Sequence, residues 1–154
     1  MLNKRIIAFL MAAILMLLPV VSMASNENLP ADFSGSVNYL IDIRNPESII
    51  SSTTNKSCVI SAVALPGTTV TLYEFNTSNN TYEKMYVGGR ALEATVGASG
   101  LYAQNIELHN GLNTIMVVAS ANGETIETVK LEITLLKSSV SENIKSLWQS
   151  LLSF

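Results

Sequence analysis

The chain has 154 residues, of which nine are Lys or Arg, 12 are Asp or Glu, one is His and one is Cys. The net charge of −3 argues against a nucleic-acid partner, because phosphate binding needs clustered Lys and Arg. The single cysteine excludes an intramolecular disulfide. The length fits one domain, large enough to fold on its hydrophobic core.

Residues 1–24 have the three parts of a secretory signal peptide. Lys4 and Arg5 precede an apolar run over 6–21, and Ser22-Met23-Ala24 then places small residues at the two positions that a signal peptidase reads. We expect cleavage after Ala24. The alternative is a retained membrane anchor, but a spanning helix needs about 20 apolar residues and this run has 16.

Cleavage at that point changes the charge of the protein. It removes two basic residues, so seven remain against 12 acidic ones and the mature chain carries −5. Such a charge is unfavourable for binding an anionic membrane surface.

Residues 25–35 are polar, contain Pro30 and Gly35, and predict a flexible lead-in. From residue 36 onward the hydrophobic period is two, which indicates strands. In the first strand, the residues expected on one face are Val37, Tyr39, Ile41 and Ile43. Seven or eight short strands are expected, at 36–43, 57–63, 69–75, 82–87, 90–96, 101–108, 113–119 and 127–135, with a further short piece at 49–50.

Turn residues separate these strands. They are Pro66-Gly67, Gly88-Gly89, the segment 97–100, Asn110-Gly111 and Asn122-Gly123. Turns every 8–12 residues or so are typical of a β-sandwich or barrel. No segment between strands is long and periodic enough for a crossover helix, so a parallel α/β sheet is not expected.

The C-terminal segment 138–154 changes to a helical pattern. Ser139 and Glu142 form a capping box at its start. Apolar residues then recur with helical spacing at Val140, Ile144, Leu147, Trp148, Leu151 and Leu152. A helix of this length is marginal alone in water, so we expect its apolar stripe to be buried against something.

Three pieces of sequence have further patterns of their own. Ile60–Leu72 combines a strand, a Pro-Gly turn and a second strand; Val96–Tyr102 leads from a Gly turn into an aromatic residue; Leu108–Ala119 follows Leu-x-x-Gly-x-Asn-x-Ile-x-Val-x-Ala. In these pieces the chain resembles the bacterial immunoglobulin-like (Ig-like) domains of secreted and surface proteins. The resemblance implies an all-β, Ig-like antiparallel β-sandwich over 36–137, with Asn113 satisfying nearby backbone groups.

A search for chemistry finds no catalytic constellation, so we expect no enzyme, no cofactor and no metal site. His109 is the only histidine and is expected in a solvated turn, while Cys58 shares a strand face with Ile60 and Ala62 and is expected to be buried and inert. The acidic residues are scattered and are expected on solvated strand faces: Asp32, Asp42, Glu74, Glu83, Glu93 and Glu107.

The favoured function is therefore a non-enzymatic module of the cell envelope or extracellular space that acts by binding or assembly with another protein. The alternative is a carbohydrate-binding accessory domain that uses an aromatic platform. Tyr73 and Phe75 share one face, which would be such a platform if exposed and core if it packs on the helix through Trp148. Self-association through the helix is a further possibility. The candidate interaction residues are Tyr73, Phe75, Tyr86, Leu147, Trp148 and Leu151.

Overall fold

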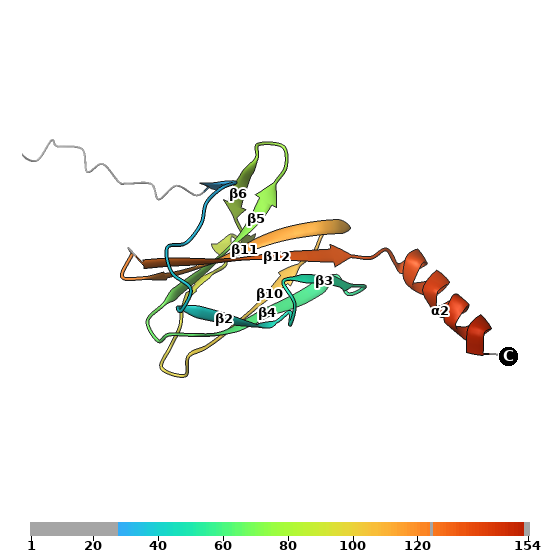
Figure 1. Cartoon of the computed structure of the whole chain (residues 1–154). Coiled ribbons are helices and arrows are strands. Elements are labelled where there is room, and N and C mark those ends of the chain that lie inside the picture. The colour runs from blue at the N-terminus through green and yellow to red at the C-terminus, as the bar shows by residue number, and fades with distance from the viewer. Residues whose placement is uncertain (1–27, 124, 153–154) are drawn as a thin grey trace, which may run out of the picture.

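The computed structural model describes residues 28–123 and 125–152, and the predicted signal peptide lies outside them. The described chain is mostly β, with one helix at its C-terminal end (Figure 1). Its elements are β1 (Asn28–Pro30), β2 (Ile41–Asn45), β3 (Ile50–Thr53), β4 (Ser57–Ala64), β5 (Thr69–Asn76), β6 (Thr81–Lys84), β7 (Tyr86–Val87), β8 (Arg90–Ala91), β9 (Glu93–Thr95), β10 (Leu101–Glu107), β11 (Gly111–Ala121), β12 (Thr125–Leu135) and α2 (Ser138–Leu152).

The strands form three sheets. The largest has seven strands, six of them in the order β1-β6-β5-β11-β12-β3, with β9 also paired to β5. A second sheet has three strands in the order β10-β4-β2, and β7 with β8 forms a separate hairpin. All pairings are antiparallel except that between β12 and β3.

The longest pairing is the hairpin of β11 and β12, which runs from Gly111 opposite Leu135 to Ala121 opposite Thr125. Its turn contains Asn122 and Gly123 with φ of 54° and 73°. Asn and Gly adopt positive φ with less strain than other residues, which suits them to a hairpin loop. The hairpin predicted at this dipeptide is confirmed.

The main core lies between the two larger sheets, because residues of both sheets contribute to one buried cluster. From β11 the inward residues are Asn113, Ile115, Val117 and Ala119, all 2 % exposed or less. The opposing sheet contributes Ile60 and Ala62 of β4 and Tyr102 and Ile106 of β10. The alternation predicted for these strands is confirmed.

The other face of the large sheet carries a smaller apolar cluster. Tyr73, Tyr82, Met116 and Val118 are buried there, and Leu29, Phe33, Phe75 and Ile126 pack against them. The predicted lead-in therefore has a structural role in its described part: β1 pairs with β6, and Leu29 and Phe33 help to cover the face that contains Tyr73. The interpretation of this face as core is right, but its packing against Trp148 is wrong.

The first predicted strand also differs from the structure. Strand β2 begins at Ile41 rather than at residue 36, and Tyr39 is 62 % exposed. Leu40 and Ile41 are consecutive and both buried, which no regular alternation allows. The reason is a long-range contact, since the backbone N–H groups of both residues donate to the Glu127 carboxylate at 2.6 and 3.1 Å.

Gly35 lies where the N-terminal segment crosses β12. A Cβ atom added to Gly35 would stand 2.6 Å from Cα of Glu127 and 2.6 Å from the carbonyl oxygen of Ile126. Because both are backbone atoms of a paired strand, they cannot move aside cheaply. We expect Gly35→Ala to lower the free energy of unfolding by about 2 kcal/mol, as overpacking does. Urea denaturation would measure this, with Gly97→Ala as the control because a Cβ there meets nothing within 4 Å.

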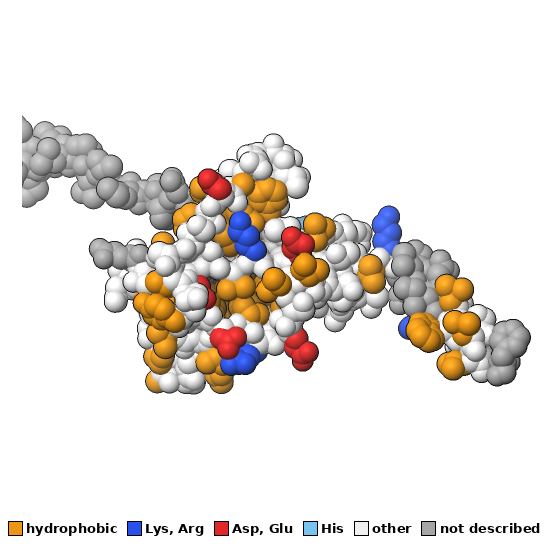
Figure 2. Space-filling model, in the orientation of Figure 1, with side chains coloured by type: hydrophobic (Ala, Val, Ile, Leu, Met, Phe, Trp, Pro, Cys, Tyr) orange, Lys and Arg blue, Asp and Glu red, His pale blue; other side chains and the backbone are white. Residues whose placement is uncertain are grey.

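The predicted C-terminal helix is confirmed as α2. In Figure 1 it continues beyond the end of β12 and lies apart from the sheets. Its described apolar side chains are 63–79 % exposed (Leu147, Trp148, Leu151 and Leu152), and they gather on one part of the helix surface in Figure 2. The described part of the domain therefore does not bury these four residues, and the expectation that the stripe is buried against something stays a prediction. Over the part of the chain described, no helix has the length and hydrophobicity needed to cross a membrane.

Candidate interaction surfaces

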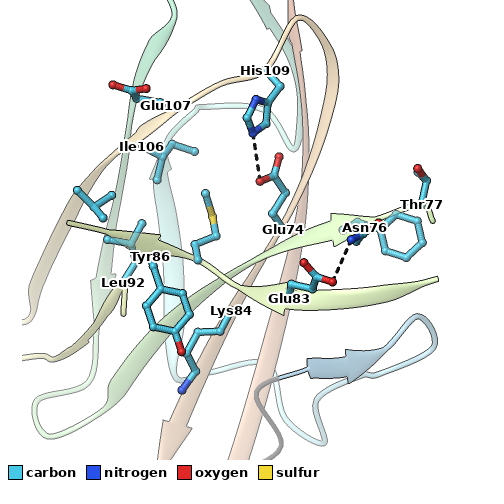
Figure 3. A pocket seen from close by; sticks show the side chains of 13 residues that line it. Glu74, Asn76, Thr77, Glu83, Lys84, Tyr86, Leu92, Ile106, Glu107 and His109 are labelled. Carbon is cyan, nitrogen blue, oxygen red and sulfur yellow. Dashed lines mark hydrogen bonds and ion pairs between the residues drawn. The ribbon is translucent and has the colours of Figure 1, made fainter. Parts of the chain in front are cut away.

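A pocket of about 700 Å³ opens at one side of the molecule, between the ends of β5, β6 and β10 (Figure 3). Its apolar lining includes Met85, Leu92 and Ile106, of which Leu92 and Ile106 are 5 % and 1 % exposed. Its polar lining includes Glu74, Glu83 and His109, with Tyr86 and Val87 of the β7–β8 hairpin at one side. Apolar surface combined with a few polar groups is the usual composition of a binding site.

The pocket exists because the two larger sheets differ in width. Contacts to Glu127 hold the start of β2 beside β12, and the contact between Glu74 and His109 places the end of β10 near β5. The large sheet continues past β5 to β6 and β1, whereas the small sheet ends at β10. The inner face of β6 therefore has no strand opposite it in the described structure, and the pocket occupies that place.

Two carboxylates dominate the polar side of this pocket. Glu74 and Glu83 stand directly opposite each other in the register of β5 and β6, on the same face of the sheet. Like charges in this position repel each other. Their described partners are a histidine and two asparagines. Nε2 of His109 lies 3.7 Å from Oε2 of Glu74, and Asn76 and Asn79 donate to Oε1 of Glu83 at 2.9 and 2.7 Å.

The nearby lysine is engaged elsewhere. Nζ of Lys84 lies 3.2 Å from Oε2 of Glu93, and Lys84 is also one of the residues that line the pocket. Burial opposes the charged form of Lys84, but the hydrogen bond to Glu93 and the nearby Tyr73 outweigh burial, so its pKa is raised. Lys84 therefore stays charged, and its charge is directed to Glu93 rather than to the carboxylate pair.

The six predicted interaction residues fall into three separate places. Tyr73 is 7 % exposed in the smaller apolar cluster. Phe75 and Tyr86 both line the pocket, with Tyr86 48 % exposed and Phe75 half-buried against Tyr82 at 5.0 Å between ring centroids. Leu147, Trp148 and Leu151 lie on α2, so the structure does not combine them with the strand aromatics into one surface.

Cys58 and His109 are the residues that could act as nucleophile and base, and their surroundings differ. The Cys58 side chain packs against the main core, and burial raises the pKa of its thiol, so it stays protonated at neutral pH. The imidazole of His109 is 79 % exposed, as predicted for a turn residue.

The hydroxyl of Tyr102 is buried without a hydrogen-bond partner among the described residues, and burial raises its pKa to about 12.

Sequence reasoning missed the importance of Glu74 and Glu83, which were expected on solvated faces. Glu74 is two residues from Leu72 and four from Val70, which are both fully buried in the main core. Strand alternation alone therefore places Glu74 on the inner face of the sheet. A carboxylate at an inward-facing position was the sequence signal that could have identified Glu74. Its pairing with Glu83 could be known only from the register of β5 and β6.

No group of three or more His, Cys, Asp or Glu side chains within residues 28–123 and 125–152 is placed to hold a metal ion. The chain matches no protein-family model, and a search of curated proteins finds no significant similarity.

Proposed function

We propose that this protein is a non-enzymatic, exported Ig-like module that acts at the cell envelope or outside the cell by binding another protein through α2. The exposed apolar side of α2 is the observation that carries this proposal. Leu147, Trp148, Leu151 and Leu152 are 63–79 % exposed. Large aromatic and aliphatic side chains on a helix are the usual anchors of a protein interface.

The charge of α2 favours a protein partner over a lipid surface. Its ionisable residues are Glu142 and Lys145, so its net charge is zero. Helices that lie on anionic membranes carry Lys and Arg on their polar face, and this helix has only one such residue. An apolar stripe beside a polar face of zero net charge instead suits a groove or a second helix on another protein.

One sequence feature supports export, and several structural features support the Ig-like assignment. Residues 1–24 have the composition of a signal peptide. Two facing sheets around one core, the Pro66-Gly67 turn and the buried Asn113 agree with an Ig-like sandwich. The bacterial source and the envelope location follow from the resemblance and are part of the proposal.

The test is fractionation of the native host that expresses the full chain or the double variant Trp148→Ser/Leu151→Ser. Both side chains are more than 60 % exposed, so the free energy of unfolding should change by less than about 0.5 kcal/mol. We expect the full chain in the envelope fraction and the variant in the medium. Gln149→Ala, on the same helix but outside the apolar stripe, should behave like the full chain. Equal distribution of all three forms would contradict the proposal.

The carbohydrate-binding alternative gains little from the structure. Tyr73 is 7 % exposed and cannot stack on a sugar ring without unpacking its cluster. Only Tyr86 among the three strand aromatics has a largely exposed ring, and one ring is a small platform. Retention of the protein on an insoluble glycan, lost on Tyr86→Ala, would revive this alternative.

A further inference from the structure

Strand β10 is an edge of the small sheet, because it pairs with β4 on one side and with no described strand on the other. It is seven residues long, it has no proline, no lysine and no bulge in its pairing with β4, and its one charged residue is Glu107 at the end of the strand. An edge of this kind exposes a row of unpaired backbone donors and acceptors.

The register shows which backbone groups are unpaired. Leu108 donates to the carbonyl oxygen of Lys56 at 2.8 Å, and Ala64 donates to that of Gly100 at 2.8 Å. Even-numbered residues of this segment therefore bond to β4. In an antiparallel pair the alternate residues direct their N–H and C=O groups the other way. Those residues are Leu101, Ala103, Asn105 and Glu107, and all four are exposed. Two of their outward groups have local partners, since the Leu101 N–H donates to Oγ of Ser99 at 3.4 Å and the Asn105 carbonyl oxygen accepts from Nε2 of Gln104 at 3.1 Å. The N–H groups of Ala103, Asn105 and Glu107 remain directed to the open edge.

The pocket lies beside this edge. Ile106, Glu107 and His109 line it from the side of β10, and the inner face of β5 and β6 forms its floor. The pocket thus occupies the position that a further strand of the small sheet would take next to β10. Inward side chains of such a strand would reach Met85 and Leu92 at one point and the carboxylates of Glu74 and Glu83 at another (Figure 3).

The chemistry of the pocket selects the occupant. Glu74 and Glu83 stand opposite each other without a lysine or arginine directed at them among the described residues, because Lys84 is held by Glu93. A Lys or Arg side chain entering the pocket would relieve their repulsion and gain charge-assisted hydrogen bonds. The neighbouring apolar lining accepts a Val, Ile or Leu side chain.

A second copy of this chain does not fit this place through its own β10. The inward residues of β10, Tyr102 and Ile106, are 6 % and 1 % exposed in the core of their own molecule. They cannot fill the pocket of a partner without leaving that core.

We propose that β10 and the adjacent pocket form a strand-accepting site for an extended segment of another protein, which alternates apolar and basic side chains on its inward face. The segment adds to β10 through the outward backbone groups of Ala103 and Glu107 and the N–H of Asn105, and its basic side chain binds Glu74 and Glu83. This is β-augmentation, in which main-chain hydrogen bonds supply affinity and side-chain pockets supply specificity. The site is independent of α2.

The full chain is expressed and the protein is purified. The purified protein is then titrated into solutions of fluorescein-labelled nine-residue peptides, and binding is followed by fluorescence anisotropy. One peptide alternates Val and Lys at inward positions separated by Thr, a second replaces Lys by Glu, and a third is the Lys peptide with N-methylated alternate amides. We expect the Lys peptide to bind at least about tenfold more tightly than the other two, which corresponds to about 1.4 kcal/mol.

Variants identify the site. Ala103→Pro removes an N–H that points to the open edge without removing a bond to β4, and it should weaken the Lys peptide about tenfold. Ala103→Thr keeps this N–H and should bind within about twofold of the original. Glu83→Gln should weaken the Lys peptide several-fold, whereas Glu47→Gln, exposed and outside the pocket, should not.

Amide hydrogen exchange gives a second readout. On binding of the Lys peptide, the amides of Ala103, Asn105 and Glu107 should exchange more slowly. The proposal is overturned if the Lys and Glu peptides bind equally, if neither binds, or if these amides are unaffected. Protection that depends on protein concentration without peptide would assign the edge to a second copy and would also overturn it. Peptide binding should persist in Trp148→Ser/Leu151→Ser, so failure here and failure of the α2 proposal are distinguishable.

Discussion

Replacement of Asn113 by alanine is expected to lower the free energy of unfolding by about 4 kcal/mol, since it leaves one buried and several part-buried backbone groups without this partner. Asn113 is 2 % exposed, and its side chain lies within hydrogen-bond distance of four backbone groups, with the two N–H groups of Nδ2 shared among three acceptors. Oδ1 accepts from the N–H of His109 at 2.7 Å, and Nδ2 donates to carbonyl oxygens of His109, Gly111 and Ile133 at 2.8, 3.0 and 3.1 Å. These bonds join the turn before β11 to β12.

The measurement is urea denaturation of the two purified proteins, followed by circular dichroism. Asn55→Ala is the matched control, because Asn55 also accepts from a backbone N–H, that of Ser57 at 3.0 Å, but is exposed so that water can replace it. We expect the control to change the free energy of unfolding by less than about 1 kcal/mol. Similar losses for both variants would show that Asn113 does not have this structural role.

Replacement of Glu127 by alanine is expected to have the second largest effect, a loss of about 3 kcal/mol. Glu127 is 7 % exposed, and its Oε2 accepts from the N–H groups of Leu40 and Ile41 at 2.6 and 3.1 Å. Hydrogen bonds to a charged group are worth about 1.5–3 kcal/mol each. Both donors lie in the buried segment that leads into β2. Without the carboxylate they lose their partner, and water cannot replace it there.

Urea denaturation of Glu127→Ala, with Glu132→Ala as the control variant, checks this expectation. Glu132 is on the same strand but exposed, so its loss should change stability by less than about 0.5 kcal/mol. In Glu127→Ala we also expect faster amide exchange at Leu40 and Ile41, because the segment loses its attachment to β12. A stable variant with unchanged exchange at these two amides would contradict the assignment.

Much of the β architecture could be predicted from alternation and turns. The pattern of Asn113, Ile115, Val117 and Ala119 placed β11 and its core face correctly, because a strand with one buried face has a period of two. The Asn122-Gly123 turn joined it to β12. These features are local, so a short window of sequence contains the information that determines them.

The errors concern contacts between distant parts of the chain. The start of β2 depends on Glu127, 86 residues from Ile41, and β1 exists only because β6 offers an edge for Asn28–Pro30. No local pattern encodes either contact. For the same reason the pocket was not predicted, since it arises where the large sheet extends beyond β10. The inward position of Glu74 was visible in the sequence, but its opposition to Glu83 was not.

The position of β12 has a mechanical consequence if α2 is held by another molecule. Tension applied through α2 would run along β12, which directly precedes the helix and is bonded along its length to β11 and, from Glu132 to Leu135, also to β3. The ladder hydrogen bonds lie across the strand. A load parallel to β12 would therefore shear many of them together instead of breaking them one after another, so the domain would resist extension at the end where it is anchored.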